Sequence, residues 1–251
     1  MSKRILVTST DLMMVQFLLP HIRNLFENGY VVEVACSDVG GRMDEIREKI
    51  RDYVKKIHTV DLHRSPAAPG NFKGYRQMKA IIEKGHYDII WTNEPVMGVV
   101  TRLAARKTRQ AGTKVLYMVH GFHFYAGAPR INWMVYYPIE KIMASKADVI
   151  CTVNREDYKR AQRFNVKEVR YIHGIGINTE RLTPGKKQND IRLELGLNKD
   201  DFIVLSVGEL NENKNQKVII EALSVLNDKK IHYLLCGKGN QVDTLKKLVA
   251  E

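Results

Sequence analysis

Short apolar runs alternate with segments of helical periodicity along most of this chain, and this alternation constrains the fold more than any other feature. Runs rich in β-branched residues predict strands at 4–8, 30–36, 57–62, 88–92, 114–119, 148–153 and 169–173. Helical patterns between them cover 13–27, 42–54, 73–84, 96–110, 132–145 and 156–164. Strands that alternate with helices form a parallel sheet with helices on both faces. The chain is therefore expected to be α/β, with a Rossmann-like doubly wound parallel sheet.

The pattern breaks at 174–178 and at 183–188, where glycine, proline and charged residues gather. It then restarts with a helix near 190–195, strands at 202–207 and 231–236, and helices at 215–227 and from 240 to the chain end. Two strands are too few for an independent sheet with its own core. We expect an N-terminal domain at 1–183 and, at 184–251, the incomplete start of a second Rossmann-like domain.

The bulk composition is that of a globular protein, with 44% hydrophobic and 27% charged residues. No apolar run approaches the roughly 18–20 residues of a membrane span. The basic start is followed only by Ile5–Val7, which is too short for the core of a signal peptide, so a cytoplasmic location is expected. The three cysteines, Cys36, Cys151 and Cys236, show no paired spacing, which predicts reduced, buried thiols.

The formal net charge of +12 favours anionic partners, although solubility alone is an alternative reading. One basic set comprises Arg102, Arg106, Lys107, Arg109 and Lys114. A second set, Arg47, Lys49, Arg51, Lys55 and Lys56, accompanies the apolar stripe Ile46, Ile50, Val54 and Ile57. We expect the stripe to pack on the sheet and the surrounding charge to face an anionic membrane surface. Nucleic acid is not an expected partner, because the aromatic residues lie away from the first set.

Polar or glycine-rich turns follow several of the expected strands, at the sheet edge where ligands of open α/β folds bind. These turns lie at 8–11, 92–94, 120–121, 154, 173–174, 208–214 and 237–239. The first strand lacks a G-x-G-x-x-G, which argues against a nicotinamide-dependent dehydrogenase. The absence of G-x-S-x-G argues against a serine hydrolase. His120-x-x-His123 has no third ligand at a supporting spacing, so no metal site is predicted.

Two of these turns carry the strongest chemical signal. The segment 207–215 reads as a strand, a short polar loop and a helix start, an arrangement that holds phosphate with backbone N–H groups and the helix dipole. Lys214 is placed to neutralise a second phosphate. In the other turn, His120 ends a strand directly before Gly121, at a position open to a cleft.

Several motifs together resemble one family. His120–Tyr125 reads His-Gly-Phe-His-Phe-Tyr and is followed by Gly127-Ala128-Pro129, and 154–158 reads Asn-Arg-Glu-Asp-Tyr. With the glycine-containing linker and the Val-Gly-x-Leu…Lys-Asn turn at 207–215, the chain resembles the family-4 nucleotide-sugar glycosyltransferases of the GT-B fold. The bacterial capsule and exopolysaccharide enzymes are the nearer look-alikes. This resemblance covers the whole chain.

The resemblance implies a retaining, metal-independent hexosyl transfer with no cofactor besides the nucleotide-sugar co-substrate, expected to be UDP-linked. Its acceptor would be a polyprenyl-linked saccharide at the inner membrane face, bound by the N-terminal domain. His120 and Lys214 would be catalytic, with Lys214 stabilising the departing nucleotide. The implied donor-binding residues are Gly208, Glu209, Asn213, Gly237 and Lys238. The implied acceptor-side residues are Thr10, Asp11, Asn93, Gly121 and Asn154.

The sequence departs from the family pattern in three places. Glu209 stands where the family usually has Arg, and 8–11 replaces a glycine-rich loop. The Glu-x7-Glu pair that grips the donor has no match, since the residues eight beyond Glu209, Glu212 and Glu221 are Lys217, Ile220 and Lys229. The pair would lie beyond 251, so this chain is expected to be inactive or poorly active alone.

Other readings stay open. A sugar-nucleotide epimerase of the same fold would need no acceptor, and a non-catalytic chain would serve only as the acceptor-binding or membrane-docking half of a split glycosyltransferase. Gly208 and Gly237 equally suit close packing of loops and helices on the sheet. Asn154 is equally suited to cap a helix.

Overall fold

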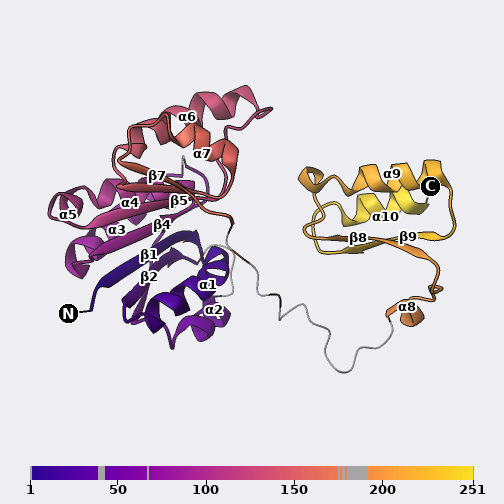
Figure 1. Ribbon diagram of the computed structural model, residues 1–251, viewed down its shortest axis with the longest axis horizontal. Helices are drawn as coiled ribbons and strands as arrows, with labels where there is room; N and C mark the ends of the chain where they lie inside the picture. Colours follow the sequence, from indigo (N-terminus) through magenta and orange to yellow (C-terminus); the bar gives the residue numbers. More distant parts are fainter. Residues whose placement is uncertain are drawn as a thin grey trace. The chain divides into compact units, whose positions relative to one another are not determined.

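The computed structural model describes residues 2–38, 43–66, 68–174, 176, 179 and 191–250, and the chain divides into two units, Met1–Ile177 and Asn178–Glu251 (Figure 1). The boundary expected between 183 and 184 lies outside the described residues, as does most of the linker. Each unit has its own parallel sheet.

The first unit is built on a seven-stranded parallel sheet in the order β3-β2-β1-β4-β5-β6-β7. Its strands are β1 Arg4–Asp11, β2 Val31–Ser37, β3 Lys56–Thr59, β4 Ile89–Asn93, β5 Lys114–Val119, β6 Val149–Thr152 and β7 Glu168–Tyr171. Its helices are α1 Leu12–Glu27, α2 Met43–Ile50, α3 Asn71–Gly85, α4 Pro95–Ala104, α5 Arg106–Gln110, α6 Arg130–Ala144 and α7 Arg155–Ala161. The doubly wound fold class predicted from the sequence is confirmed.

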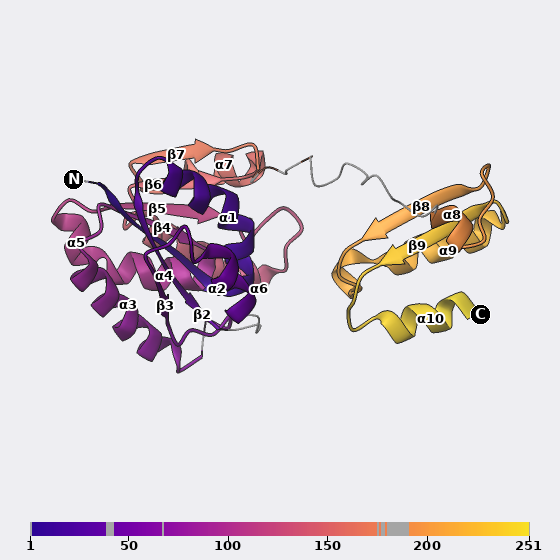
Figure 2. The same cartoon turned by 90° about the horizontal axis from the view of Figure 1, so that it is seen from below.

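Helices cover both faces of this sheet (Figure 2). Successive side chains of a strand point to opposite faces, so Ile5 and Val7 pack with α1 and α2, whereas Leu6 packs with α3 and α4. Further along the sheet, Tyr117 and Val119 pack with α6 and α7. Because the strands of this sheet are all parallel, their carboxyl ends lie at the same edge. That edge holds the predicted acceptor-side residues.

Two of the expected boundaries in this unit were wrong. Residues 8–11, expected to form a turn, continue β1, because Thr8 and Ser9 pair with β2 and the Thr8 hydroxyl donates to Thr92 Oγ1 at 2.8 Å. Polar side chains that satisfy one another can extend a strand beyond its apolar run. The helix expected over 96–110 is two helices, which meet at Ala105.

The second basic set also differs from expectation. Its helix, α2, ends at Ile50, and Ile57 belongs to β3. Ile46 and Ile50 are buried in the core, which confirms the packing role of that part of the stripe.

The second unit has a two-stranded parallel sheet of β8 Phe202–Val207 and β9 Ile231–Cys236. Its described helices are α8 Ile191–Glu194, the 3-10 turn η2 Glu212–Lys214, α9 Gln216–Leu226 and α10 Val242–Ala250.

Of the cysteines expected to be buried, Cys36 and Cys151 are, and burial raises the pKa of the Cys36 thiol to about 12. Cys236 is exposed, so that expectation was wrong. It ends β9, in a sheet whose strands are only partly covered in the described part of the chain.

Candidate functional site

The end of β1 is held by the carboxylate of Glu94, which lies between β4 and α4. Glu94 Oε2 accepts hydrogen bonds from the Ser9 hydroxyl at 2.5 Å, from Thr10 N at 2.7 Å and from Asp11 N at 3.2 Å. Glu94 has a φ of 64°, a left-handed conformation that is uncommon outside glycine. Burial raises the pKa of its carboxyl. The backbone N–H groups of Thr10 and Asp11, at the end of β1, are thus hydrogen-bonded to a buried carboxylate of the protein itself.

Predicted acceptor-side residues lie around that carboxylate. Thr10 Oγ1 accepts from Met97 N at 3.0 Å, which fixes the first turn of α4. Asp11 is buried and pairs with Arg64. Asn93 Nδ2 donates to Thr8 O at 3.1 Å, which turns its Oδ1 toward His120.

His120 joins this network from β5. Its Nε2 lies 3.0 Å from Asn93 Oδ1, and burial lowers its pKa, so the neutral ring is favoured near pH 7. Because Asn93 Oδ1 can only accept, Nε2 carries the proton and Nδ1 carries the lone pair. In this state His120 offers a hydrogen-bond acceptor at Nδ1.

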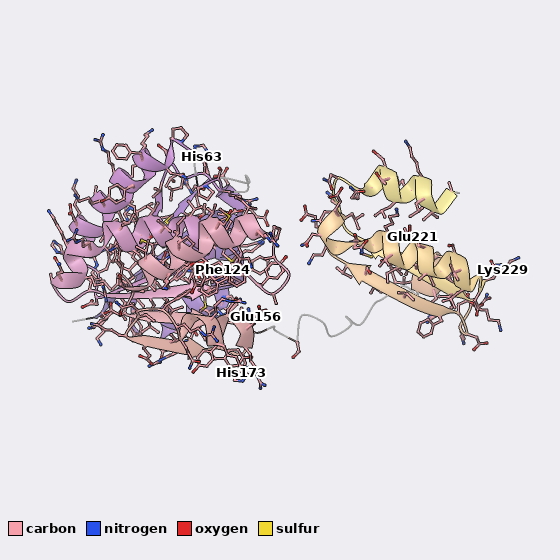
Figure 3. All side chains as sticks on the ribbon, turned by 90° about the horizontal axis from the view of Figure 1, so that it is seen from above. His63, Phe124, Glu156, His173, Glu221 and Lys229 are labelled. Atoms are coloured by element: carbon pink, nitrogen blue, oxygen red, sulfur yellow. The ribbon has the colours of Figure 1, made fainter. Side chains whose placement is uncertain are left out.

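The loop after β5 is tied to the start of α7. Gly121 has a φ of 139°, which favours glycine. Asp157 Oδ2 accepts from Phe122 N at 3.0 Å, and Glu156 Oε1 accepts from Ala126 N at 2.8 Å. Phe124, labelled with Glu156 in Figure 3, is fully buried and stacks on Phe122 with ring centroids 4.6 Å apart. These contacts hold the His120 loop in place.

Asn154 acts on this loop indirectly. Its Oδ1 accepts from Asp157 N at 2.8 Å, the helix cap that the sequence left open as an alternative, and its Nδ2 donates to Asp157 Oδ2 at 2.7 Å. Asn154 therefore orients the carboxylate that holds Phe122 N.

A cavity of about 220 Å³ adjoins the network. It is lined by Thr10, Glu94 and several residues not singled out from the sequence. Among these are Arg64 and Tyr136. His123, which the sequence analysis considered only as a metal ligand and as part of the 120–125 motif, also lines the cavity and stacks on Tyr136 at a ring-centroid distance of 4.6 Å. Glu94 could have been found, since it separates a strand end from Pro95, the residue that begins α4. Nothing in the local sequence marks Arg64, because the ion pair with Asp11 spans 53 positions.

Arg102 lies beneath this region, although the sequence placed it among surface cations. It is fully buried, and its Nη2 donates to Glu140 Oε2 at 2.9 Å. Its guanidinium lies 3.9 Å from the ring centroid of Tyr117, whose hydroxyl donates to Glu140 Oε1. This buried and paired cation between α4 and α6 therefore belongs to the core of the first unit.

In the second unit, the predicted donor-binding glycines bring two loops together. A Cβ on Gly237 would lie 1.7 Å from Gly208 O. Gly208 N donates to Cys236 O at 3.0 Å, and Leu210 N donates to Lys238 O at 2.9 Å. The close approach of the two loops is therefore sufficient to explain why residue 237 is a glycine.

The polar residues of that loop are exposed: Glu209, Asn213, Lys214 and Lys238. The loop contains η2, and Asn211 Oδ1 accepts from Lys214 N at 3.0 Å. Asn215, with a φ of 49°, precedes α9, whose first turn receives no side-chain cap. An uncapped helix N-terminus beside a lysine is suited to bind an anion.

The structure thus places two hydrogen-bonded groups at the end of β1, Thr10 and Asp11 with Glu94, and His120 with Asn93. The predicted donor-side residues lie in the second unit. Within the described ranges, no three His, Cys, Asp or Glu side chains are grouped as metal ligands would be. None of the helices in those ranges is both long enough and apolar enough to cross a bilayer.

Comparison with known families identifies the chain. Residues 15–181 match the family described as Glycosyltransferase Family 4, and residues 187–251 match Glycosyl transferases group 1. The chain belongs to glycosyltransferase family 4.

Two curated relatives extend this match. The Bacillus subtilis (strain 168) protein named "Putative glycosyltransferase EpsD" is 40% identical over 255 residues, which cover 99% of this family-4 chain and 65% of the relative. The Escherichia coli UDP-Gal:alpha-D-GlcNAc-diphosphoundecaprenol alpha-1,3-galactosyltransferase is 24% identical over 228 residues, or 86% of this chain and 56% of the relative. This chain therefore spans less than two thirds of the length of either relative.

Solved structures agree on the fold. Anabaena HepE, in complex with UDP and glucose, matches with a TM-score of 0.66 at 16% identity, over 98% of this chain and 64% of that one. The UDP-GlcNAc 2-epimerase of Neisseria meningitidis, bound to UDP-GlcNAc, matches with a TM-score of 0.56 at 10% identity, over 99% and 68%. Because transferases and epimerases share this fold, the fold alone does not separate the two activities.

Proposed function

We propose that this chain takes part in moving a hexose from a UDP-linked donor to a polyprenyl-linked saccharide during synthesis of a cell-surface polysaccharide. The observation that carries the proposal is the family-4 match, supported by 40% identity to EpsD. A lipid-linked acceptor is supported by the E. coli relative, whose name describes transfer from UDP-Gal to a diphosphoundecaprenol-linked sugar.

The first unit would bind the acceptor at the carboxyl ends of β1, β4 and β5. The neutral His120 ring presents Nδ1, which can accept a hydrogen bond from a sugar hydroxyl and fix its orientation. The second unit would hold the donor diphosphate at the start of α9, where the Lys214 cation offsets charge on the departing nucleotide. A lysine in that role removes the need for a metal ion.

We also propose that the protein works as a peripheral protein on the cytoplasmic face of the membrane. The charge of +12 supports attraction to anionic lipid. Sugar transfer by the 251-residue chain alone is expected to be weak or absent, because its sequence contains no Glu-x7-Glu match at Glu209, Glu212 or Glu221. Efficient transfer by this chain would contradict that expectation.

Calorimetric titration of the chain with UDP tests the donor site. The wild-type chain should bind UDP, and Lys214→Ala should weaken binding about tenfold, since one charge-assisted contact to phosphate contributes roughly 1.4 kcal/mol. Lys217→Ala is the matched control, because Lys217 already pairs with Glu221 and should change binding less than twofold. An unchanged affinity in Lys214→Ala would overturn the role of that residue.

Product analysis separates the remaining readings. Transfer of labelled sugar to lipid supports the proposal, whereas conversion of UDP-GlcNAc to its 2-epimer without acceptor would make the protein an epimerase. A chain that binds acceptor lipid but no UDP at millimolar concentration would be the non-catalytic half of a split enzyme.

A further inference from the structure

The outer face of α6 carries a continuous apolar stripe. We call it the α6 ridge: Ile131, Met134, Val135, Pro138, Ile139 and Ile142, all exposed. Their spacing of three and four residues places them on one side of the helix. Met134 is 73% exposed, Ile142 65% and Ile131 61%. No charged side chain interrupts the ridge.

The inner face of α6 is mostly apolar, apart from Glu140, which is paired with Arg102. Met143 and Ala144 are buried, and Trp133, Tyr136 and Tyr137 pack against the core cluster of β5 and β6. A helix on the surface of a globular protein normally turns a polar face to water. A contiguous exposed apolar patch of this kind marks a surface that contacts something else.

Positive charge lies at the end of the ridge. Ser145 and Lys146, directly after α6, line a cavity of about 360 Å³, which we call the basic cavity. Its cations are Arg102, Arg106, Arg109, Lys114, Lys146 and Lys167. The lining includes one carboxylate, Asp148, which is already paired with Arg109 and Lys167.

Three of those cations are available to a ligand. Within the described part of the chain, Arg106, Lys114 and Lys146 form no ion pair with a carboxylate. In the second basic set, by comparison, Lys49 is paired with Glu45 and Arg51 with Glu48. Beside the end of α6, the three cations that have no carboxylate partner among the described residues line a single cavity.

We propose that the α6 ridge and the basic cavity together dock this protein on an anionic bilayer. The ridge enters the boundary between headgroups and acyl chains, and Arg106, Lys114 and Lys146 bind lipid phosphates. This inference rests on the proposed function, since a polyprenyl-linked acceptor would lie in the same membrane.

One further observation favours a bilayer. Ile139 of the ridge also lines an apolar groove of about 190 Å³, which shares Pro95, Val96 and Tyr136 with the cavity beside Glu94. The ridge is thus continuous with the candidate acceptor site.

Flotation of the 251-residue chain with lipid vesicles tests the proposal. Vesicles of phosphatidylcholine with 30% phosphatidylglycerol should bind the chain at least tenfold more tightly than vesicles of phosphatidylcholine alone. Met134→Ser with Ile142→Ser should weaken binding at least tenfold, and so should Arg106→Gln with Lys146→Gln. Inorganic phosphate at 10 mM should compete weakly, whereas full displacement by it would point to a soluble anion site and overturn docking.

Matched variants control for lost charge and lost apolar surface. Lys49→Gln with Arg51→Gln removes two paired positive charges from the second basic set, and Val225→Ser with Val249→Ser removes two exposed apolar side chains from the second unit. Both should change binding less than twofold. Equal losses in these controls, or unchanged binding in the ridge variant, would overturn the proposal.

Sedimentation velocity and UDP titration complete the test. A dimer that dissociates in the ridge variant would show that a second copy covers the ridge, which also overturns docking. UDP binding should be unaffected by the ridge variant, and unchanged denaturant unfolding followed by tryptophan fluorescence confirms that its first unit is folded. Loss of vesicle binding with UDP binding intact, or the reverse, distinguishes failure of the docking surface from failure of the proposed function.

Discussion

The two units follow the same strand–helix alternation but bury their strands to very different degrees. In the first unit, the residues of β1 from Ile5 to Asp11 are all buried. In the second, no residue of β8 is buried, and Val207 is 77% exposed. Local pattern thus suffices to form a parallel strand, whereas burial depends on neighbouring strands and on helices over both faces.

This difference predicts that the two units respond unequally to equivalent changes. The two tryptophans, Trp91 and Trp133, both lie in the first unit, so their fluorescence reports on that unit alone. Hydrogen exchange in peptides covering 202–236 reports on the second unit.

The largest effect is expected at Arg102. Replacing Arg102 with Ala should destabilise the first unit by about 3–5 kcal/mol, because Glu140 would remain buried without its cation. Denaturant unfolding followed by tryptophan fluorescence measures this loss. The double variant Arg102→Leu, Glu140→Leu should be more stable than the single one, and Lys217→Ala at the exposed pair of the second unit should cost under about 0.5 kcal/mol. An equal loss of stability in Arg102→Ala and Lys217→Ala would contradict the expected difference between the buried pair and the exposed pair.

Gly237→Ala should destabilise the second unit by up to about 3 kcal/mol, since the added Cβ would clash with Gly208 O. Faster hydrogen exchange in 202–236 with unchanged tryptophan unfolding would show the effect confined to that unit. Gly112→Ala, at a φ of 118° with open space around it, is the comparison in the first unit and should act only through backbone strain. Normal exchange in Gly237→Ala would mean that the two loops are not packed as described.

Lowering the pH should reduce the stability of the first unit, because Asp148 becomes protonated. Burial alone would raise the pKa of this carboxyl, but hydrogen bonds from Arg109 and Val115 N outweigh burial and lower the pKa from 3.8 to about 2. The stabilisation, about 2 kcal/mol, is present above pH 3.8 and is lost as the pH falls toward 2. Unfolding of wild type and Asp148→Asn between pH 6 and pH 2 measures it. If the free energies of unfolding of the two proteins changed in parallel with pH, this role of Asp148 would be contradicted.

The smallest effect concerns helix caps. Asn154→Ala should cost about 1 kcal/mol in the first unit, by loss of the α7 cap. Asn211→Ala removes the equivalent bond to Lys214 N at the short η2 turn, and should loosen only that turn. Asn154→Ser should retain the cap without placing a second carboxylate against Asp157, so a smaller loss of stability in Ser than in Ala identifies capping as the cause.

The sequence predicted the parallel α/β architecture and most of its elements, because periodicity and turn residues are local signals. It also pointed to His120 and Asn93, which the structure joins by a hydrogen bond. It did not predict that Arg102 is buried, since its partner Glu140 lies 38 positions away on another helix. Arg64 was missed for the same reason.

The Glu94 carboxylate has a consequence for what the β1 edge can recognise. The carboxylate accepts hydrogen bonds from Thr10 N and Asp11 N, so these donors are already occupied by a group of the protein itself. A phosphate that approached them would be repelled by the negative charge of Glu94. A neutral polyol meets no such repulsion, because its hydroxyls can donate to the same oxygens. Under the proposed function, we therefore expect this edge of the sheet to favour the neutral sugar portion of the acceptor over its phosphates.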